Sequence, residues 1–415
     1  MPDIFDSIAK WLTEQALHEE ELSRTIRTLG ARLIQGGIPV NRISIGQSVL
    51  HPLIGVLNHR WDKDEDQLHI SSVPRSDISK AFFAATPSPF GDFTVGRSTE
   101  TTGQSRSIVA HLKDPEARAR YPLFEELAAA GVAGYAAFNR RFGFSGMVIP
   151  DLGGEFAGAS VAFTTRRSTG FTEHEINGLE SLMTPLCVGI QTMSQRALTN
   201  ELLETYLGRL SGSHVLSGQS ARGDGEAIDC VLLYSDMRDS LTLSQSQPLD
   251  AYLATLNDYF DLIVQPVEEH GGEILKLIGD GVLAIFPVDA ADRPRDNMCA
   301  AALSAARETR VCRDALNTTR RAAGLPEIDF GIALHYGTVI YGNVGAPKRL
   351  DFTATGPAVG LVSRCEAMTR ELEHPILATA SFAERCPEPA RALGTFDLKG
   401  VPGKTLLFRF DAKHE

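Results

Sequence analysis

The segment 274–286 constrains the fold of this chain more than any other. Apolar residues dominate it on both sides of Gly279-Asp280-Gly281. Two apolar runs around a glycine-containing turn predict a β-hairpin, because glycine adopts the positive φ angles that tight hairpin turns require. A second apolar run, 231–235, ends at Asp236. The sequence therefore predicts two carboxylates, Asp236 and Asp280, each at the end of a buried strand.

Two such carboxylates, if the fold brings them together, match the needs of a metal-bound triphosphate. Mg²⁺ and Mn²⁺ prefer hard oxygen ligands and take only a few from the protein, since the phosphates supply the rest. Lys276 lies four residues before Asp280, so that a ligand could contact both. Each aspartate alone has an ordinary alternative, a strand-end cap for Asp236 and a turn residue for Asp280. Together they favour a metal site.

Residues 226–412 carry five segments that resemble, in the same order, the catalytic domain of class III nucleotidyl cyclases. The segments are Ser235–Arg238, Gly271–Phe286, Phe330–Gly345, Asp351–Arg364 and Leu398–Gly400. The resemblance implies an α+β, ferredoxin-like fold and the conversion of a nucleoside triphosphate into its 3′,5′-cyclic monophosphate and pyrophosphate. It also implies that Asp236 and Asp280 hold two Mg²⁺ or Mn²⁺ ions per active site.

The same resemblance implies how the nucleotide is bound. Lys276 and Thr353 match the two positions that read the base. Lysine can donate to adenine, whereas guanine is typically read by glutamate and cysteine there, so ATP is the expected substrate. Arg364 matches the arginine that stabilises the transferring phosphate, for which its planar guanidinium is suited. Lys399 matches a position that contacts the terminal phosphates.

Two departures from the family pattern predict slow catalysis. Gly360 stands seven residues after Thr353, where the family has an asparagine that orients the ribose and the transition state. Losing such a positioning group typically costs ~10²-fold or more in rate. Asp239, Ser240 and Leu241 replace the usual Gly-Phe-Thr before a helix that should bind phosphate, and Asp239 would either repel the triphosphate or cap the helix and turn away.

The first half of the chain is expected to be a regulatory region. We expect an N-terminal helix in residues 1–36, a small antiparallel sheet in 37–193, and a helical linker with a Gly/Ser-rich end in 194–225. The order of helix, sheet and exit helix resembles GAF- or PAS-type sensor domains, which implies an unidentified small-molecule ligand or a dimerisation role. Thr172 is expected to cap the exit helix, with Glu175 as its capping-box partner.

Composition excludes several classes of protein. A net charge of −12 over 415 residues argues against nucleic-acid binding and against adhesion to anionic membranes. No apolar run approaches the ~18 residues of a membrane span. The six cysteines are scattered without a Cys-x-x-Cys motif, which favours reduced thiols in the cytoplasm.

The resemblance, together with these patterns, predicts a cytoplasmic, sensor-regulated adenylate cyclase. A homodimer is implied by the resemblance, because family active sites form between two cyclase domains: one gives the aspartates and the other gives the lysine, threonine and arginine. Two alternatives stay open, a catalytically weak ATP-binding regulator and a ligand sensor with a degenerate cyclase domain. His51 and His59 suggest a haem site only weakly, and ordinary core or surface roles are expected for both.

Overall fold

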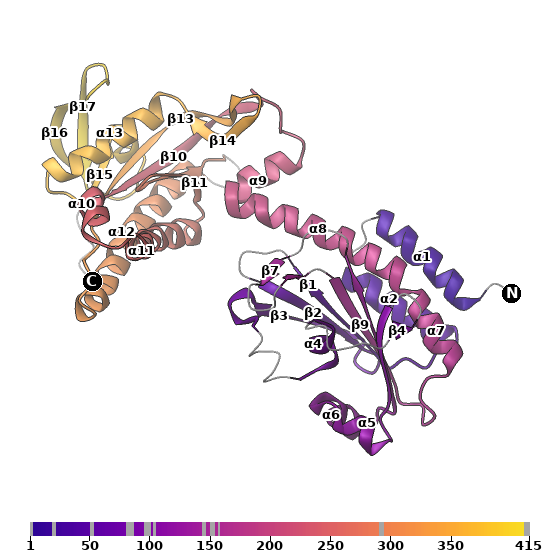
Figure 1. Cartoon of the computed structure of the whole chain (residues 1–415). Coiled ribbons are helices and arrows are strands. Elements are labelled where there is room, and N and C mark those ends of the chain that lie inside the picture. Colours follow the sequence, from indigo (N-terminus) through magenta and orange to yellow (C-terminus); the bar gives the residue numbers. More distant parts are fainter. Residues whose placement is uncertain are drawn as a thin grey trace. The chain divides into compact units, whose positions relative to one another are not determined.

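The structure is a computed structural model, and it describes residues 3–18, 22–49, 54–79, 87–94, 101–102, 105–142, 147–149, 154–156, 158–289 and 294–410. The chain divides into two compact units, Met1–Leu202 and Leu203–Glu415 (Figure 1). Each unit has its own hydrophobic cores. The finer division into sensor, linker and catalytic regions stays a prediction.

The first unit is built on a seven-stranded sheet with the order β3-β2-β1-β9-β6-β5-β4. Its strands are β1 (Arg42–Ser48), β2 (Ile54–Asp62), β3 (Gln67–Pro74), β4 (Thr101–Thr102), β5 (Ser105–His111), β6 (Gly134–Arg141) and β9 (Gly158–Thr165), while β7 (Met147–Ile149) pairs with β8 (Gly154–Phe156). The helices are α1 (Ile4–His18), α2 (Leu22–Gln35), α4 (Pro89–Thr94), α5 (Pro115–Ala119), α6 (Pro122–Ala129), α7 (Glu173–Ser181) and α8 (Met183–Leu207). A 3₁₀ turn, η1, covers Arg75–Asp77.

Alternate residues along the strands face two separate cores. Ile43, Trp61 and Phe163 pack with α1, α2, α7 and α8 on one face of the sheet. Ile108 and Tyr135 pack with α4 and α6 on the other face. This alternation follows from the period of two residues in a β-strand. The expected sheet between entry and exit helices is therefore present, and its assignment to the GAF or PAS type stays a prediction.

Several local expectations are confirmed and others are wrong. Thr172 and Glu175 form the predicted capping box at the start of α7. The single N-terminal helix expected in residues 1–36 is instead two helices, α1 and α2. A Cβ atom at Gly36 would lie 2.4 Å from Ile4, so the end of α2 lies beside the start of α1. Strand β3 was not expected, because its largely exposed residues lack apolar alternation. It forms as an edge strand by pairing with β2.

The second unit has the predicted ferredoxin-like core. Its elements are β10 (Gly225–Met237), α10 (Ser240–Ser246), α11 (Leu249–Glu269), β11 (Glu273–Ile278), β12 (Gly281–Pro287), α12 (Arg295–Ala322), β13 (Phe330–Ala346), β14 (Arg349–Thr355), α13 (Pro357–Glu371), β15 (Ile376–Thr379), α14 (Ala380–Ala383), β16 (Arg391–Asp397) and β17 (Lys404–Arg409). The sheet order β11-β12-β10-β13 continues through β15, β17 and β16. Strands β10 to β13 with α11 and α12 give the βαββαβ arrangement of that fold.

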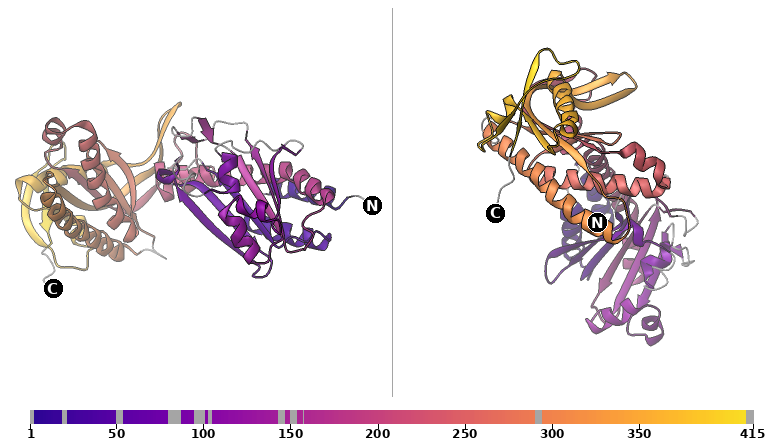
Figure 2. Two further views of the ribbon diagram at one scale, coloured as in Figure 1. Left: turned by 60° about the horizontal axis from the view of Figure 1, so that its bottom comes forward. Right: turned by 90° about the vertical axis from the view of Figure 1, so that its left-hand side faces the viewer.

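Helices cover both faces of this sheet (Figures 1 and 2). Val231 and Leu233 of β10 pack against α11 and α12, whereas Cys230 and Leu232 pack against α13. The predicted hairpin is confirmed: Ile278 pairs with Gly281, and Gly279 has a φ of +65° in the two-residue turn. This turn places Asp280 beside the end of β10, where the amide of Met237 donates to the carbonyl of Asp280 at 3.2 Å.

The segment after α8 is helical for longer than expected. Helix α9 (Arg209–Leu216) occupies the start of the predicted Gly/Ser-rich linker end. Its first turn is held by Glu273 of β11, whose buried carboxylate accepts from the amides of Leu210 at 2.8 Å and Ser211 at 3.2 Å. A carboxylate at a helix N-terminus satisfies amides that have no intrahelical partner. The acidic residue after Gly271-Gly272 therefore has a structural role that the sequence did not reveal.

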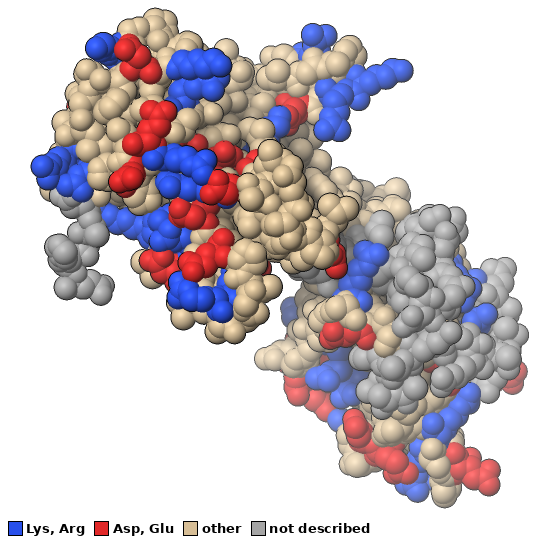
Figure 3. Space-filling view, turned by 60° about the vertical axis from the view of Figure 1, so that its left-hand side comes forward, with Lys and Arg blue, Asp and Glu red and all other residues tan. Residues whose placement is uncertain are grey.

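No helix among the described residues combines the length and the apolar character needed to cross a membrane. On the face of the second unit that Figure 3 presents, Lys and Arg side chains are interspersed with Asp and Glu.

Candidate active site

Asp236 and Asp280 lie together at one end of the sheet, as the sequence predicts. Asp236 is opposite Gly281 in the β10–β12 pairing, and Asp280 is the residue before Gly281. Burial, and then the negative charge of Asp280, raise the pKa of Asp236 to about 6. Among the described residues, no Lys, Arg or His forms an ion pair with either carboxylate. The two acids therefore form a half-buried anionic pair without a protein cation.

Gly281 makes room for this pair. A Cβ atom at position 281 would lie 2.7 Å from the hydroxyl oxygen of Tyr234 and 3.1 Å from Oδ1 of Asp236. Any larger residue would displace the carboxylate from the strand end. The two carboxylates lie beside a residue that has no side chain. Such a pair of oxygen donors fits a hard divalent cation such as Mg²⁺ or Mn²⁺.

A third acid, Glu366 of α13, belongs to the same cluster. Its side chain is buried, with Thr369 donating to Oε1 at 3.3 Å. Burial, and then the negative charge of Asp236, raise the pKa of Glu366 to about 7. Sequence reasoning did not single out this residue. The sequence did contain a signal for it, because Glu366 falls at helical spacing among the buried positions of α13. Those positions are Ala358, Val362, Cys365 and Thr369.

Replacing Glu366 is expected to stabilise the metal-free protein more at pH 8 than at pH 5.5. The raised pKa means that the unfolded state loses this proton near pH ~4.3, whereas the folded state keeps it up to about 7. The destabilisation by Glu366 therefore grows through this window and is complete only above it. Glu366→Gln removes this cost, which is at most roughly 2–4 kcal/mol. Thermal melts in EDTA at both pH values measure the difference.

The matched control is Glu371→Gln, a change at an exposed position on the same helix. Its melting temperature is expected to follow that of the parent at both pH values. An equal shift for Glu366→Gln at pH 5.5 and pH 8 would contradict the proposed repulsion.

Lys276 lies on β11, and its ammonium group pairs with the carboxylate of Asp351 on β14. Both side chains are about two-fifths exposed, at 41% and 42%. Thr353 follows Asp351 by two residues and therefore points to the same face of β14. The structure thus brings together the two predicted base-reading positions, and it adds Asp351, which the sequence reasoning did not assign a role.

Gly360, Arg364 and Lys399 line one hollow of about 580 Å³. Its wall also includes His335, a buried imidazole whose Nδ1 lies 2.8 Å from the hydroxyl of Thr379. Burial lowers the pKa of His335 to about 4, so this ring is neutral at physiological pH. Arg364 and Lys399 are exposed and have no hydrogen bond or ion pair within the described part of the chain. The hollow therefore offers two free cations, which suits an anionic ligand.

Asp239 does not cap the helix that follows it. It precedes α10 with a φ of +57°, a left-handed conformation that favours glycine, and its side chain makes no cap hydrogen bond. Its carboxylate pairs instead with Arg370 of α13. The expected cap is therefore absent, and the pairing with Arg370 partly offsets the negative charge of Asp239.

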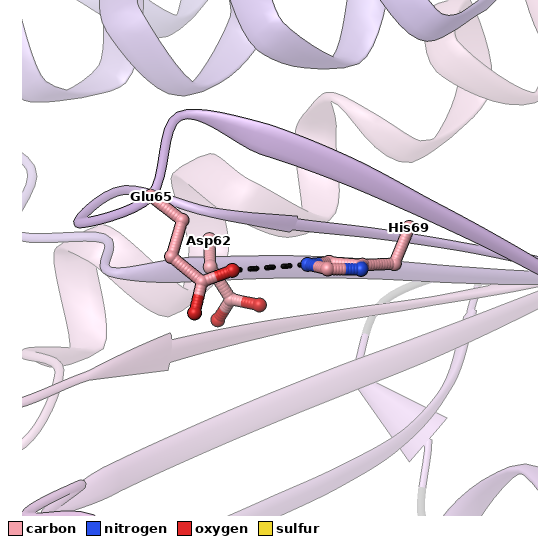
Figure 4. A group of neighbouring side chains, drawn as sticks. All are labelled: Asp62, Glu65 and His69. Carbon is pink, nitrogen blue, oxygen red and sulfur yellow. Dashed lines mark hydrogen bonds and ion pairs between the residues drawn. The ribbon is translucent and has the colours of Figure 1, made fainter.

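A second group of possible metal ligands lies in the first unit (Figure 4). Glu65 and His69 pair at 3.0 Å. Asp62 is engaged elsewhere, because Oδ1 accepts from Arg42 at 2.6 Å and Oδ2 lies 2.9 Å from Arg60. An exposed ion-pair network explains this group without a metal.

Comparison with known proteins relates part of this chain to cyclases. No protein-family profile matches the chain. The chain is 35% identical over 171 residues to adenylate cyclase 1 of Rhizobium meliloti, covering 40% of this chain and 25% of that protein. It is 35% identical over 164 residues to an adenylate cyclase of Anabaena cylindrica, covering 38% and 31%. The chain thus spans about a quarter to a third of the length of these relatives.

Among solved structures, an adenylyl cyclase from P. aeruginosa superposes with a TM-score of 0.42 at 24% identity, over 46% of this chain and 97% of that one. Over about two fifths of its length, this chain is therefore similar in sequence to adenylate cyclases.

Proposed function

We propose that this chain is an adenylate cyclase that converts ATP into 3′,5′-cyclic AMP and pyrophosphate between two copies of its second unit. The observation that carries the proposal is the convergence of Asp236 and Asp280 without a protein cation. The adenylate cyclase names of the Rhizobium and Anabaena relatives support ATP as the substrate.

In this proposal Asp236 and Asp280 hold two Mg²⁺ or Mn²⁺ ions. Bound ions of this kind neutralise the triphosphate and lower the pKa of the ribose 3′-hydroxyl that attacks the α-phosphorus. The carboxylates fix where the triphosphate lies. Arg364 then donates to the oxygens of the transferring phosphate, and Lys399 binds the terminal phosphates. Preorganised donors of this kind stabilise charge that grows in the transition state.

Lys276 is proposed to read the base, with Thr353 as its partner. An ammonium group can only donate hydrogen bonds, and adenine N1 is an acceptor whereas guanine N1 carries a hydrogen. Asp351 holds the lysine in place through its ion pair and leaves a carboxylate oxygen for the adenine amino group. These donors and acceptors favour ATP over GTP.

The geometry of α13 supports the proposal that two copies are needed. Glu366 faces Asp236, whereas Arg364 precedes it by two residues and is exposed. Two residues along an α-helix correspond to a rotation of ~200°, so Arg364 points away from the aspartate pair of its own chain. A second copy that presents its own Arg364 to those aspartates completes the site.

The test is product formation by the full chain with Mn²⁺-ATP or Mn²⁺-GTP. We expect cyclic AMP to form at least about tenfold faster than cyclic GMP, because a site built to donate to adenine N1 leaves groups unpaired with guanine. Equal rates would reject the role of Lys276. Binding of ATP without any product would favour the regulator, the rival function that Gly360 and Asp239 suggest.

Mixing two inactive variants is expected to restore activity. Asp280→Ala removes a metal ligand and Arg364→Ala removes the phosphate donor, so a mixed dimer has one site with both defects and one intact site. Random exchange would return up to about a quarter of the parent rate. The matched control mixes Asp280→Ala with Asp236→Ala. Because both aspartates lie in the same half of the site, no mixed dimer in this control has an intact site. Recovery in the control, or none in the test mixture, would contradict the shared site.

A further inference from the structure

The first unit contains a hollow that the proposed cyclase chemistry does not use. It has a volume of about 580 Å³ and lies between the sheet and the second half of α8. Its apolar walls come from three places: Leu57 and Ile70 of the sheet, Leu22 of α2, and Met193, Ala197 and Leu198 of α8. Ligand-binding pockets typically have volumes of ~300–1,000 Å³ and mostly apolar walls. Size and lining therefore suit a small organic molecule.

The deep side of this hollow carries a polar group without a partner. His59 of β2 pairs in register with Ile45 on one side and Ile70 on the other, and its side chain is 5% exposed. Within the described part of the chain, Nδ1 of His59 is buried and makes no hydrogen bond. Buried polar groups are nearly always hydrogen-bonded, so a lone one lining a cavity indicates a ligand or a water that belongs there. Rotation of the imidazole about its bond to Cβ brings a different ring atom to face the hollow.

The neighbouring buried polar side chain, unlike His59, has a hydrogen-bond partner. Gln47 of β1 is equally buried, but its Oε1 accepts from the hydroxyl of Ser194 on α8 at 2.8 Å. This hydrogen bond fixes α8 to the sheet beside the hollow. Of these two buried polar side chains in the wall, only the imidazole is left for a ligand to satisfy. Burial also lowers the pKa of His59, which keeps the ring neutral.

We propose that this hollow binds a small, uncharged and largely apolar molecule that carries one hydrogen-bonding group, which pairs with the imidazole of His59. An ionised ligand is disfavoured, because a neutral ring among apolar walls does not repay its loss of hydration. A partner helix is also disfavoured, because its apolar side chains would cover the mouth and leave the ring unsatisfied.

The site also has a connection to the rest of the chain. The α8 residues of the wall fall between Thr192 and Glu201, and α8 continues to Leu207, beyond the boundary between the units at 202 and 203. A bound molecule would therefore pack against a helix that runs into the second unit. The binding inference stands by itself, and only an effect on cyclic AMP formation would rest on the proposed function as well.

The test uses N-phenyl-1-naphthylamine, a neutral apolar fluorophore with one N–H group, added to the full-length protein. We expect saturable binding of one molecule per chain. Ala197→Trp, which fills the hollow, should abolish binding, and Gln195→Trp, an exposed change on α8 outside the hollow, should not. His59→Phe should weaken binding about 3- to 10-fold, the worth of one hydrogen bond.

Circular dichroism and thermal melts of each variant establish that it is folded, and the readout does not depend on catalysis. Non-saturable binding, or equal binding by the folded Ala197→Trp variant, would overturn the proposal. The proposal would also be overturned if Ala197→Trp left dye binding unchanged but altered the oligomeric state measured by light scattering. That result would mean that a second copy of the chain covers the hollow.

Discussion

An Asp280→Ala variant of the full chain is expected to lose cyclic AMP formation by at least ~10²-fold with Mn²⁺-ATP, the scale seen when one preorganised electrostatic group is removed. The remaining carboxylate, Asp236, would face the triphosphate alone. Asp280 lies in a two-residue turn and packs into no core, so the fold should persist. The rate of cyclic AMP release, measured by chromatography, checks the prediction.

A second readout separates metal loss from general damage. Without Asp280 the pKa of Asp236 should return toward its ordinary range, because the neighbouring charge contributes to its rise. Mn²⁺ should raise the melting temperature of the parent but not that of the variant, since ligands that bind only the folded state stabilise it. The matched control is Asp261→Ala, an exposed change on α11. Full activity in Asp280→Ala would remove the basis of the proposed metal site.

A Gly360→Asn variant is expected to turn over faster than the parent, by up to ~10²-fold, the loss attributed to a missing positioning group. Gly360 is in the second turn of α13 and lines the hollow with Arg364 and Lys399. A Cβ atom built at this position has no heavy atom within 4 Å, so an asparagine side chain has room to reach the ribose. Initial rates at saturating Mn²⁺-ATP check the prediction.

Gly360→Ala is the control for this experiment. Alanine is a better helix former than glycine by ~1 kcal/mol, so it should stabilise α13 without supplying an amide. An increase in rate with asparagine but not with alanine would assign the slow turnover to the missing side chain. If neither variant is faster than the parent, Gly360 is not the cause, and the left-handed Asp239 becomes the next position to change.

Much of the second unit could be predicted because its signals are local. The Gly279-Asp280 turn follows from glycine's tolerance of positive φ, and α11 and α12 follow from apolar residues at helical spacing. The capping box of Thr172 is likewise a matter of three neighbouring residues. Expectations failed where tertiary contacts override local preference: α2 folds back on α1, and α9 extends into the predicted linker, where Glu273 of a distant strand holds its first turn.

By itself, the sequence determined the order of the elements and predicted the residues that we propose to carry the chemistry, because turns, caps and periodicity are properties of neighbouring residues. Only the tertiary structure decided the environment of those residues. It buries Glu366 beside Asp236, pairs Lys276 with Asp351, separates Arg364 from the aspartates, and leaves His59 unpartnered in a hollow. Desolvation and pairing between residues that are distant in the sequence set these environments, with 75 positions between Lys276 and Asp351, and no local pattern encodes them.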